Sequence, residues 1–186
     1  MATARARRRG GQAVKVVVTG PFAAGKTTLI RTISEITVLS TERGITDSTR
    51  KRKAETTVAM DFGRITIDRD VILYLFGTPG QERFWFLWNG LFEGALGAVV
   101  LVDTRRLEVS FDVMGRLEER GVPFVVAVNT FPDGPRYPLE ELRSALDLPP
   151  EIPIVECDVR RRASSRDVLM TLMRFLHTLA LSRSIT

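Results

Sequence analysis

The run from Gly20 to Thr27 has the residue types and spacing of a phosphate-binding loop. It reads G-P-F-A-A-G-K-T and fits the pattern G-x-x-x-x-G-K-[ST], with a strand pattern before it and a helical pattern after it. Gly25 lets the backbone approach phosphates closely, so that successive amides form an anion nest at a helix N-terminus. Lys26 supplies a point charge between terminal phosphates, and the Thr27 hydroxyl is a ligand for Mg²⁺. The loop predicts nucleotide binding, which kinases, ATPases and GTPases share.

The elements that must position this loop alternate between apolar β-branched runs and helical patterns, as in an α/β sheet with crossover helices. Arg69-Asp70 falls in a short turn between two strand patterns, so we expect those strands to form an antiparallel hairpin. We predict one α/β domain with the P-loop NTPase fold, in which helices flank both faces of a mixed six-stranded sheet. The predicted strands cover residues 14–19, 59–67, 71–76, 98–102, 124–128 and a last segment that begins at Pro153.

Helical patterns follow three of these strands. One covers residues 26–35, directly after the phosphate loop. A second begins at Pro138 and repeats leucines along one face. The last is expected to begin near Ser164 or Ser165 as its cap, with Asp167 in the first turn. Its predicted buried stripe consists of Val168, Leu169, Leu172, Met173, Leu176 and Leu179.

Composition places the chain among soluble globular proteins. Its 186 residues suit one compact domain, and 44% hydrophobic with 26% charged residues is an ordinary balance. No apolar run reaches the ~20 residues of a membrane helix. The single cysteine, Cys157, excludes an intramolecular disulfide framework and fits a reducing, cytoplasmic location.

The formal net charge of +5 is concentrated at the N-terminus, where four arginines lie within the first nine residues. We therefore expect residues 1–13 to form a basic disordered tail and residues 14–186 to form the nucleotide-binding domain, and we expect no nucleic-acid partner. The alternative for the tail is weak peripheral contact with anionic lipid or an acidic partner. The cluster consists of Arg5, Arg7, Arg8 and Arg9.

Later segments point to one class of phosphate-loop protein. Gly77 to Phe84 reads G-T-P-G-Q-E-R-F and resembles switch II of the Ras-like small GTPases, where D-T-A-G-Q-E-R-F is common. Thr57 to Phe62 resembles the end of switch I in the Rab-like branch, and Val126 to Asn129 resembles the start of the guanine-reading N-K-x-D motif. Glu156-Cys157-Asp158 stands where the family has its S-A-K loop. With the phosphate loop, these segments follow the family order between residues 14 and 180.

Within that family, the chain resembles the conservon GTPases of actinobacteria, relatives of the gliding-motility polarity GTPase. The resemblance rests on Gln-Glu-Arg-Phe in switch II, on Asn-Thr-Phe-Pro-Asp-Gly in the guanine loop, and on the Glu-Cys-Asp loop. It implies a switch in bacterial signalling that binds GTP or GDP with Mg²⁺. It also implies a Roadblock-type regulator and a sensor-kinase-like membrane protein as partners.

The resemblance assigns roles to individual residues. Gln81 and Lys26 would be catalytic, with Gln81 orienting the attacking water, and Thr57 would join Thr27 at the metal. Asn129, Asp133 and the backbone of the Cys157 segment would hold the base. The nucleotide-contacting set is Gly20, Phe22, Ala23, Ala24, Gly25, Lys26, Thr27, Thr28, Gly80, Asn129, Thr130, Asp133, Cys157, Asp158 and Val159.

Two departures affect the phosphate end. Gly77 occupies the position of the aspartate that holds a magnesium-bound water in the family, so we expect weaker metal binding and expect Gly77→Asp to tighten it. Asp61 or Asp103 are the alternatives for the missing carboxylate. Phe22 stands where the family keeps a small residue. It either obstructs the attacking water or is packed within a rearranged loop.

Two further departures affect the base end. Pro132 moves Asp133 one residue beyond its usual distance from Asn129, and Thr130 replaces the lysine that normally packs along the base. We expect Asp133 to keep its guanine-reading role in a bulged loop. The alternative is that it is only a turn residue before Gly134.

Switch II is unusually rich in large apolar residues, so some are expected to form a nucleotide-dependent partner surface rather than core. They are Phe84, Trp85, Phe86, Leu87, Trp88, Leu91 and Phe92.

The sequence therefore favours a guanine-nucleotide switch with slow GTP hydrolysis. Gly77 and Phe22 also permit an interaction module that binds nucleotide with negligible hydrolysis. A P-loop kinase is a third possibility, because the basic run Arg50 to Lys53 imitates a lid, but Gly80-Gln81 favours a GTPase.

Overall fold

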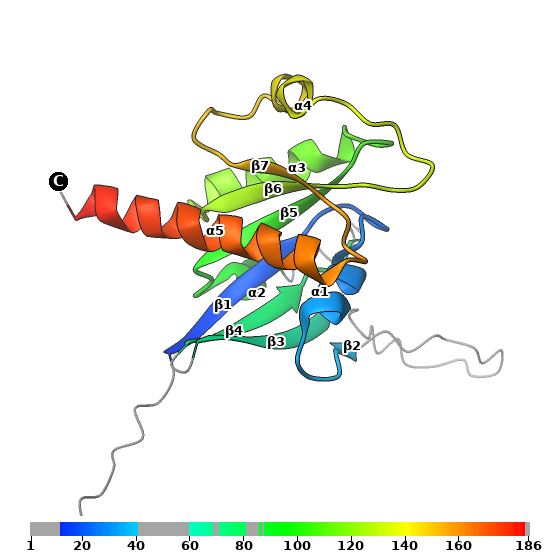
Figure 1. The fold of residues 1–186 in the computed structure, drawn as a ribbon. Helices are drawn as coiled ribbons and strands as arrows, with labels where there is room; N and C mark the ends of the chain where they lie inside the picture. The colour runs from blue at the N-terminus through cyan, green and yellow to red at the C-terminus, as the bar shows by residue number, and fades with distance from the viewer. Residues whose placement is uncertain (1–11, 41–59, 69–70, 81–85, 87, 185–186) are drawn as a thin grey trace, which may run out of the picture.

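A seven-stranded mixed sheet forms the centre of the molecule in the computed structural model, which describes residues 12–40, 60–68, 71–80, 86 and 88–184 (Figure 1). The strand order is β2-β3-β4-β1-β5-β6-β7. The strands are β1 (Gln12–Thr19), β2 (Leu39–Ser40), β3 (Asp61–Asp68), β4 (Val71–Gly77), β5 (Gly97–Asp103), β6 (Phe124–Asn129) and β7 (Ile154–Cys157). The helices are α1 (Lys26–Ile33), α2 (Trp88–Phe92), α3 (Val109–Glu119), α4 (Leu139–Ala145) and α5 (Arg162–Arg183).

The mixed character of the sheet comes from one edge. β1 pairs in parallel with β4 and β5, and β6 pairs in parallel with β5 and β7. β3 is antiparallel to β4, as the hairpin pattern predicted, although the turn at residues 69–70 lies outside the described residues. β2 is antiparallel to β3 and is the one strand that the prediction of six strands omitted, because two residues carry no periodic signal.

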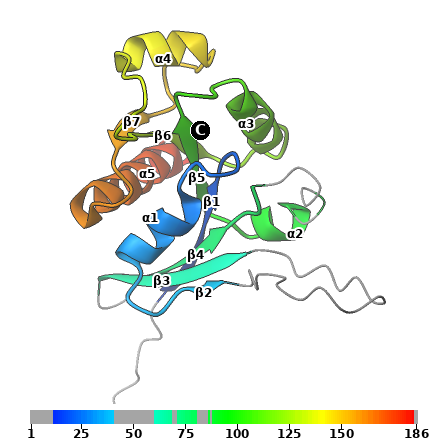
Figure 2. The ribbon, with the colours of Figure 1, turned by 90° about the vertical axis from the view of Figure 1, so that its right-hand side faces the viewer.

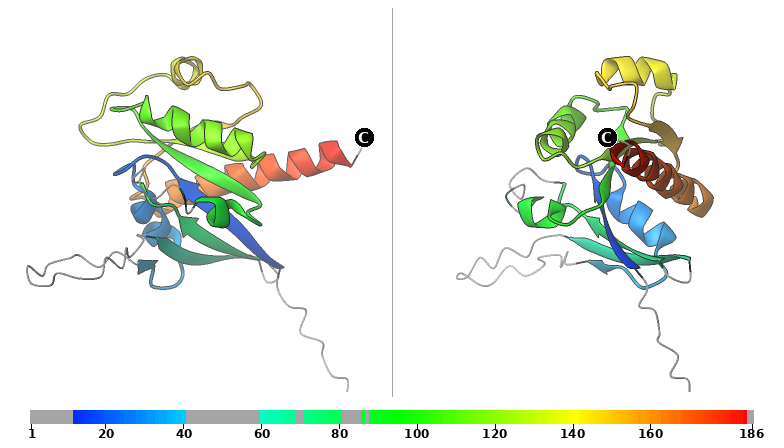
Figure 3. Two further views of the ribbon diagram at one scale, coloured as in Figure 1. Left: turned by 180° about the vertical axis from the view of Figure 1, so that it is seen from behind. Right: turned by 90° about the vertical axis from the view of Figure 1, so that its left-hand side faces the viewer.

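Two apolar layers cover the sheet. One joins β1, β5 and β6 to α1 and α5, and the other joins the opposite faces of the same strands to α2, α3 and α4. Figure 2 shows α1 and α5 on one side and α2 and α3 on the other, and Figure 3 shows α3 from the face opposite α5. Every residue of β5 and β6 is buried, because both faces of these strands are covered.

Several predicted boundaries were wrong by a few residues. β1 begins at Gln12 and pairs with β4 from there, two residues before the predicted start of the strand. α1 ends at Ile33 rather than at residue 35, because Ser34 has an extended backbone with φ −62° and ψ 140°. α5 begins at Arg162, so Asp167 is not in its first turn.

The serines expected to cap α5 lie inside its first turn instead. The Ser164 hydroxyl accepts the Asp158 amide at 3.0 Å, and the Ser165 hydroxyl donates to the Val159 carbonyl at 3.1 Å. These bonds tie the helix to the loop after β7. Within the predicted stripe, Met173 and Leu179 are only partly buried, and the remaining four side chains are buried.

Strand register brings the predicted functional residues to one edge of the sheet. Asp103 pairs with Asn129, and Asn129 pairs with Cys157. Gly77 pairs with Val18 on one side and with Asp61 on the other. The carboxyl ends of parallel strands are the usual place for ligands in open α/β sheets. Among the described residues, no helix has the length and hydropathy needed to cross a membrane.

Candidate functional site

The phosphate loop joins β1 to α1 through two glycines whose backbones lie in the left-handed region. Gly20 has a φ of 139° and Gly25 a φ of 104°. A Cβ atom at residue 20 would lie 2.4 Å from the Leu101 carbonyl oxygen, and one at residue 25 would lie 2.8 Å from the Asn129 side-chain nitrogen. Both conformation and space therefore require glycine at these positions.

Lys26 is buried within the loop that precedes it. Its side chain is 7% exposed, and its amine donates to the carbonyl oxygens of Gly20 at 2.8 Å and Pro21 at 2.7 Å. The backbone of Gly80 lies close by, because a Cβ atom there would be 2.7 Å from the Lys26 amine. The end of β4, the phosphate loop and a partly desolvated positive charge therefore meet at one point, which suits an anionic ligand.

Asp61 supplies a carboxylate beside Thr27. The Thr27 hydroxyl donates a hydrogen bond to Asp61 Oδ2, and Asp61 is 8% exposed. Asp61 is the register partner of Gly77, and a Cβ atom at residue 77 would lie 3.0 Å from the Asp61 Cβ. The Asp61 side chain thus fills the space that a side chain at Gly77 would need. Of the two alternatives for the missing carboxylate, the geometry favours Asp61.

The Asp103 side chain does not contact Thr27 but pairs with Arg105. Its carboxylate accepts hydrogen bonds from the Arg105 side chain at 2.9 and 2.7 Å, and it is fully buried. These bonds hold the pKa of Asp103 below its ordinary value, against the opposing effect of burial. The Arg105 guanidinium also lies over the Phe131 ring, 3.8 Å from its centroid. Asp103 therefore organises a neighbouring turn rather than the site beside Thr27.

The oxygen atoms of Thr27 and Asp61 fit a hard cation such as Mg²⁺. In the described part of the chain, no group of three or more His, Cys, Asp or Glu side chains could hold a metal by itself. A cation here would need further oxygen ligands, of the kind that nucleotide phosphates supply.

Phe22 points out of the phosphate loop. Its side chain is 57% exposed, so the loop is not packed around it, and that alternative of the sequence analysis was wrong. Its carbonyl accepts a hydrogen bond from Arg106 at 2.8 Å. Arg106 in the turn after β5 thus contacts the phosphate loop, a role that the sequence analysis did not predict.

Asn129 joins three loops. It is 2% exposed, its amide nitrogen donates to the Ala24 carbonyl at 3.0 Å, and its oxygen accepts the Val159 amide at 3.3 Å. Thr130 lies against the end of β7, because its amide and hydroxyl both donate to the Cys157 carbonyl, at 2.7 and 3.2 Å. Asn129 and Thr130 therefore hold the predicted base loop to both neighbouring segments.

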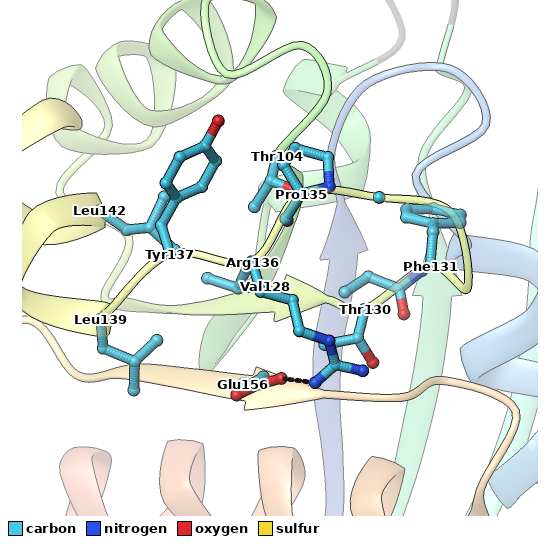
Figure 4. A pocket seen from close by; sticks show the side chains of 12 residues that line it. Thr104, Val128, Thr130, Phe131, Pro135, Arg136, Tyr137, Leu139, Leu142 and Glu156 are labelled. Atoms are coloured by element: carbon cyan, nitrogen blue, oxygen red, sulfur yellow. Dashed lines mark hydrogen bonds and ion pairs between the residues drawn. The ribbon is translucent and has the colours of Figure 1, made fainter.

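The middle of the base loop is a tight turn. The Gly134 amide donates to the Phe131 carbonyl at 3.2 Å, and Asp133 between them is exposed. Behind this turn lies a pocket with Val128, Leu139 and Leu142 in its wall (Figure 4).

Figure 4 also shows the ion pair between Arg136 and Glu156, with an N–O distance of 2.9 Å. The pair joins the base loop to β7 at the pocket's rim. Asp133 is exposed, so this loop is less enclosed than the phosphate loop.

The segment after β7 is held by local polar contacts. The Arg160 side chain donates to both Asp158 oxygens at 2.8 Å, which lowers the pKa of Asp158 despite some desolvation. Cys157 is buried, and burial together with Asp158 and Glu156 raises the pKa of its thiol to about 12. The amides of Asp158 and Val159 are bonded to Ser164 and Asn129, so a base that uses the Val159 amide must replace Asn129.

Other predicted positions divide between core and surface. Trp88, Leu91 and Phe92 of the switch II segment are buried, whereas Phe86 is 69% exposed. Part of the apolar cluster is therefore core. Predicted residues that lie outside the described part of the chain are Thr57, Gln81, Phe84, Trp85 and Leu87, together with the run from 50 to 53.

Sequence reasoning missed Arg105 and Arg106. Their position directly after Asp103, at the carboxyl end of a predicted strand, was the available signal. Their partners Phe131 and Phe22 lie far away in the sequence, so no local pattern joined them.

Comparison with known proteins gives both sequence relatives and similar folds. An uncharacterized protein of Methanocaldococcus jannaschii, MJ1339, is 31% identical over 118 residues, which is 62% of this chain and 69% of that protein. The Ras-related protein Rab-11C of Dictyostelium discoideum is 32% identical over 92 residues, which is 48% of this chain and 36% of the Rab protein.

Two solved G domains of FeoB proteins have the same fold. The G domain of the T. maritima FeoB iron transporter has a TM-score of 0.60 and 19% identity, covering 91% of this chain and 99% of that domain. The G domain of FeoB from Methanococcus jannaschii has a TM-score of 0.62 and 13% identity, covering 89% and 99%. These matches show the α/β P-loop GTPase fold, with seven strands in this chain.

A family model also matches the chain, over residues 38–178. The match includes the base loop and the segment after β7, and it begins after the phosphate loop. The chain belongs to the family described as conserved hypothetical ATP binding proteins.

Proposed function

We propose that the protein is a guanine-nucleotide switch that binds GTP and GDP with Mg²⁺ and hydrolyses GTP slowly. The observation that carries the proposal is the position of Asn129. This buried side chain bonds to the phosphate loop at Ala24 and to the segment after β7 at Val159. Phosphate-holding and base-holding segments are therefore parts of one site.

The choice of base rests on the chain's own residues. The family description names ATP, whereas the Rab relative belongs to a group of Ras-related proteins. An Asp133 carboxylate turned toward the ligand accepts hydrogen bonds from the ring N–H and exocyclic amine of guanine, which adenine does not offer on that edge. The wrong base leaves this carboxylate unpaired, and an unpaired charge in a site costs much affinity. This argument favours guanine.

At the phosphate end, each residue has a definite part. The loop amides and Lys26 bind the phosphates, and Lys26 exchanges its two carbonyl contacts for phosphate oxygens. Thr27 and Asp61, together with the proposed ligand Thr57, hold the metal. A bound Mg²⁺ supplies charge stabilisation to the β- and γ-phosphates. Gln81, which lies outside the described residues, orients the attacking water.

We expect slow GTP hydrolysis because of the residue at the mouth of the phosphate loop. Phe22 places an exposed aromatic ring at the mouth of the loop, where an attacking water or a partner's arginine must enter. This ring also favours the second candidate, an interaction module with negligible hydrolysis. A single-turnover rate well below about 1 s⁻¹ that rises with a partner supports the switch. No turnover with or without a partner supports the module.

The partners are proposed from the resemblance to the conservon GTPases. A Roadblock-type regulator and a sensor-kinase-like membrane protein would act on a signalling switch of this kind. The exposed Phe86 of the switch II segment is a candidate contact for the regulator, because large exposed apolar side chains favour protein interfaces.

Calorimetric titration with GDP, GTP, ADP and ATP in Mg²⁺ tests the function. We expect guanine nucleotides to bind more than ~100-fold more tightly than adenine nucleotides. Asp133→Asn should shift preference toward xanthine nucleotides, because the amide donates where the carboxylate accepts. Asp112→Asn, at an exposed position on α3, is the matched control. Equal affinities for GDP and ADP would contradict the guanine assignment.

A further inference from the structure

Arg105 is fixed in place at the turn after β5. Its Nε and Nη2 atoms donate to the two oxygens of Asp103, at 2.9 and 2.7 Å, and its backbone amide donates to the same carboxylate at 3.0 Å. Asp103 is fully buried. This bidentate pair raises the pKa of Arg105 and holds the plane of its guanidinium. Arg105 therefore presents a charged plane with a fixed orientation.

That plane meets the middle of the base loop. The guanidinium lies over the Phe131 ring, 3.8 Å from its centroid. In Figure 4 the Phe131 ring lies at the end of the loop opposite Tyr137. Asp133 is two residues further on, and its negative charge also raises the Arg105 pKa, after the contribution of Asp103. One side chain thus contacts the aromatic residue of the loop and acts on the carboxylate that would select guanine.

The two ends of the loop are attached separately. Thr130 bonds to the Cys157 carbonyl, and the Pro135 carbonyl accepts a hydrogen bond from Thr104 at 2.8 Å. Between these attachments the loop contains the additional residue Pro132. Arg105 contacts this middle part.

We propose that Arg105 is a positioning residue for nucleobase specificity, which holds Phe131 and Asp133 in the arrangement that selects guanine. The proposal rests on the proposed function and goes beyond it by naming a determinant outside the base loop. Without Arg105, the loop must be ordered when the base binds, and this cost reduces the contribution of the Asp133 contacts. Lysine cannot replace it, because an ammonium lacks the planar fork that pairs with Asp103 and stacks on Phe131.

The test compares GDP with inosine diphosphate, which lacks the exocyclic amine that Asp133 would accept. The variants are Arg105→Lys, Phe131→Leu and the double variant Asp103→Asn/Arg105→Gln, which avoids leaving a buried carboxylate unpaired. Arg174→Gln is the control, since Arg174 is an exposed arginine on α5 and is not part of the base loop. Dissociation constants for both nucleotides are measured by calorimetry, with thermal stability recorded for each variant.

We expect the GDP preference over inosine diphosphate to fall by about 3- to 10-fold in each variant of the Arg105–Phe131 stack, a small part of what a full set of base contacts provides. Arg174→Gln should keep the wild-type ratio. In an Asp133→Asn background, Arg105→Lys should change the ratio no further, because the effect passes through Asp133.

A purely structural role gives a different result. Both nucleotides would then weaken equally, and an unchanged ratio in Phe131→Leu and in the double variant would overturn the proposal while leaving the proposed function intact. A wild-type protein that binds GDP and ADP equally would contradict the proposed function itself.

Discussion

The phosphate end and the base end of the site lie at neighbouring strand ends, but different contacts hold them. At the phosphate end, Lys26 and Asp61 are almost fully buried, and two glycines fix the path of the loop. At the base end, Asp133 is exposed and Arg105 is 43% exposed. The sheet fixes one region directly, whereas side-chain contacts hold the other.

This difference bears on how each region accommodates its departure from the Ras-like motifs that the sequence resembles. Gly77 lacks a carboxylate, but its register partner Asp61 brings one to Thr27 from the adjacent strand. Pro132 lies in a loop that has no strand partner, and there Arg105 stacks on Phe131, the contact that we propose compensates for the added residue. A change within a sheet can be compensated across the ladder, whereas a change in a loop requires a new tertiary contact.

The largest expected effect tests the phosphate end. Asp61→Gly should weaken Mg²⁺ binding to the GDP complex by about 10- to 100-fold, the range for loss of a carboxylate that supports a metal site. The double variant Asp61→Gly/Gly77→Asp should recover much of it, because the carboxylate returns on the partner strand. The Mg²⁺ affinity of each variant is measured by following nucleotide release as a function of Mg²⁺ concentration.

The single substitution Gly77→Asp is the control. The sequence predicted that it tightens magnesium binding, but a side chain there lies 3.0 Å from the Asp61 Cβ and adds a like charge, so we now expect weaker binding. Nucleotide affinity in chelator checks that each variant folds. Failure of the double variant to recover magnesium affinity would show that the two strand positions are not equivalent.

A smaller effect tests whether changes at the phosphate end reach the core. Trp88 is 1% exposed and packs edge-on against Phe92, with ring centroids 5.5 Å apart. The Lys15 amine holds the end of α2 through the carbonyls of Gly90 and Glu93. We therefore expect Trp85→Phe, which leaves Trp88 as the reporter, to show little change in emission between GDP and a non-hydrolysable GTP analogue.

The complementary variant, Trp88→Phe, should retain a spectral shift from Trp85 if the switch segment responds to the terminal phosphate. Lys26→Ala should abolish that shift by weakening phosphate binding. A large shift in Trp85→Phe at full occupancy would mean that the core around α2 rearranges with the nucleotide.

The last prediction concerns reactivity rather than binding, at the thiol of the base end. The Cys157 pKa is raised from 9.0 to about 12, so the thiol is neutral at pH 8 and should react with a thiol reagent at least about 100-fold more slowly than in urea-unfolded protein. Because the folded pKa is the higher one, its contribution to stability is complete below about pH 9 and is lost as the pH rises toward 12.

Reaction rates with and without GDP, and unfolding midpoints of wild type and Cys157→Ala between pH 8 and 11, provide the measurement. Fast labelling without nucleotide would mean that the base end opens readily, which would sharpen its contrast with the phosphate end. A steeper stability loss in Cys157→Ala than in wild type would contradict the assigned direction.

The sequence predicted the fold because its main strands carry continuous β-branched runs, as in β5 and β6. It missed β2, because a strand of two residues shows no alternation of apolar and polar side chains. It misplaced the start of α5, because the hydroxyls of Ser164 and Ser165 form hydrogen bonds with the preceding loop instead of capping the helix. At the site, the phosphate loop could be predicted from the local spacing of its residues. The pairing of Asp61 with Gly77 and the stack of Arg105 on Phe131 could not, since register and tertiary contacts join residues far apart in the chain.

The two hydrogen bonds of the Asn129 side chain have a consequence for how this edge of the sheet unfolds locally. Its amide is hydrogen-bonded to the phosphate loop and to the segment after β7 at the same time. Neither segment can detach from it without weakening the burial of a side chain that is only 2% exposed. Local unfolding at this edge is therefore cooperative, with the loops opening as one unit rather than fraying separately. A nucleotide entering this edge meets either a closed site or one fully open, with few partly ordered states between.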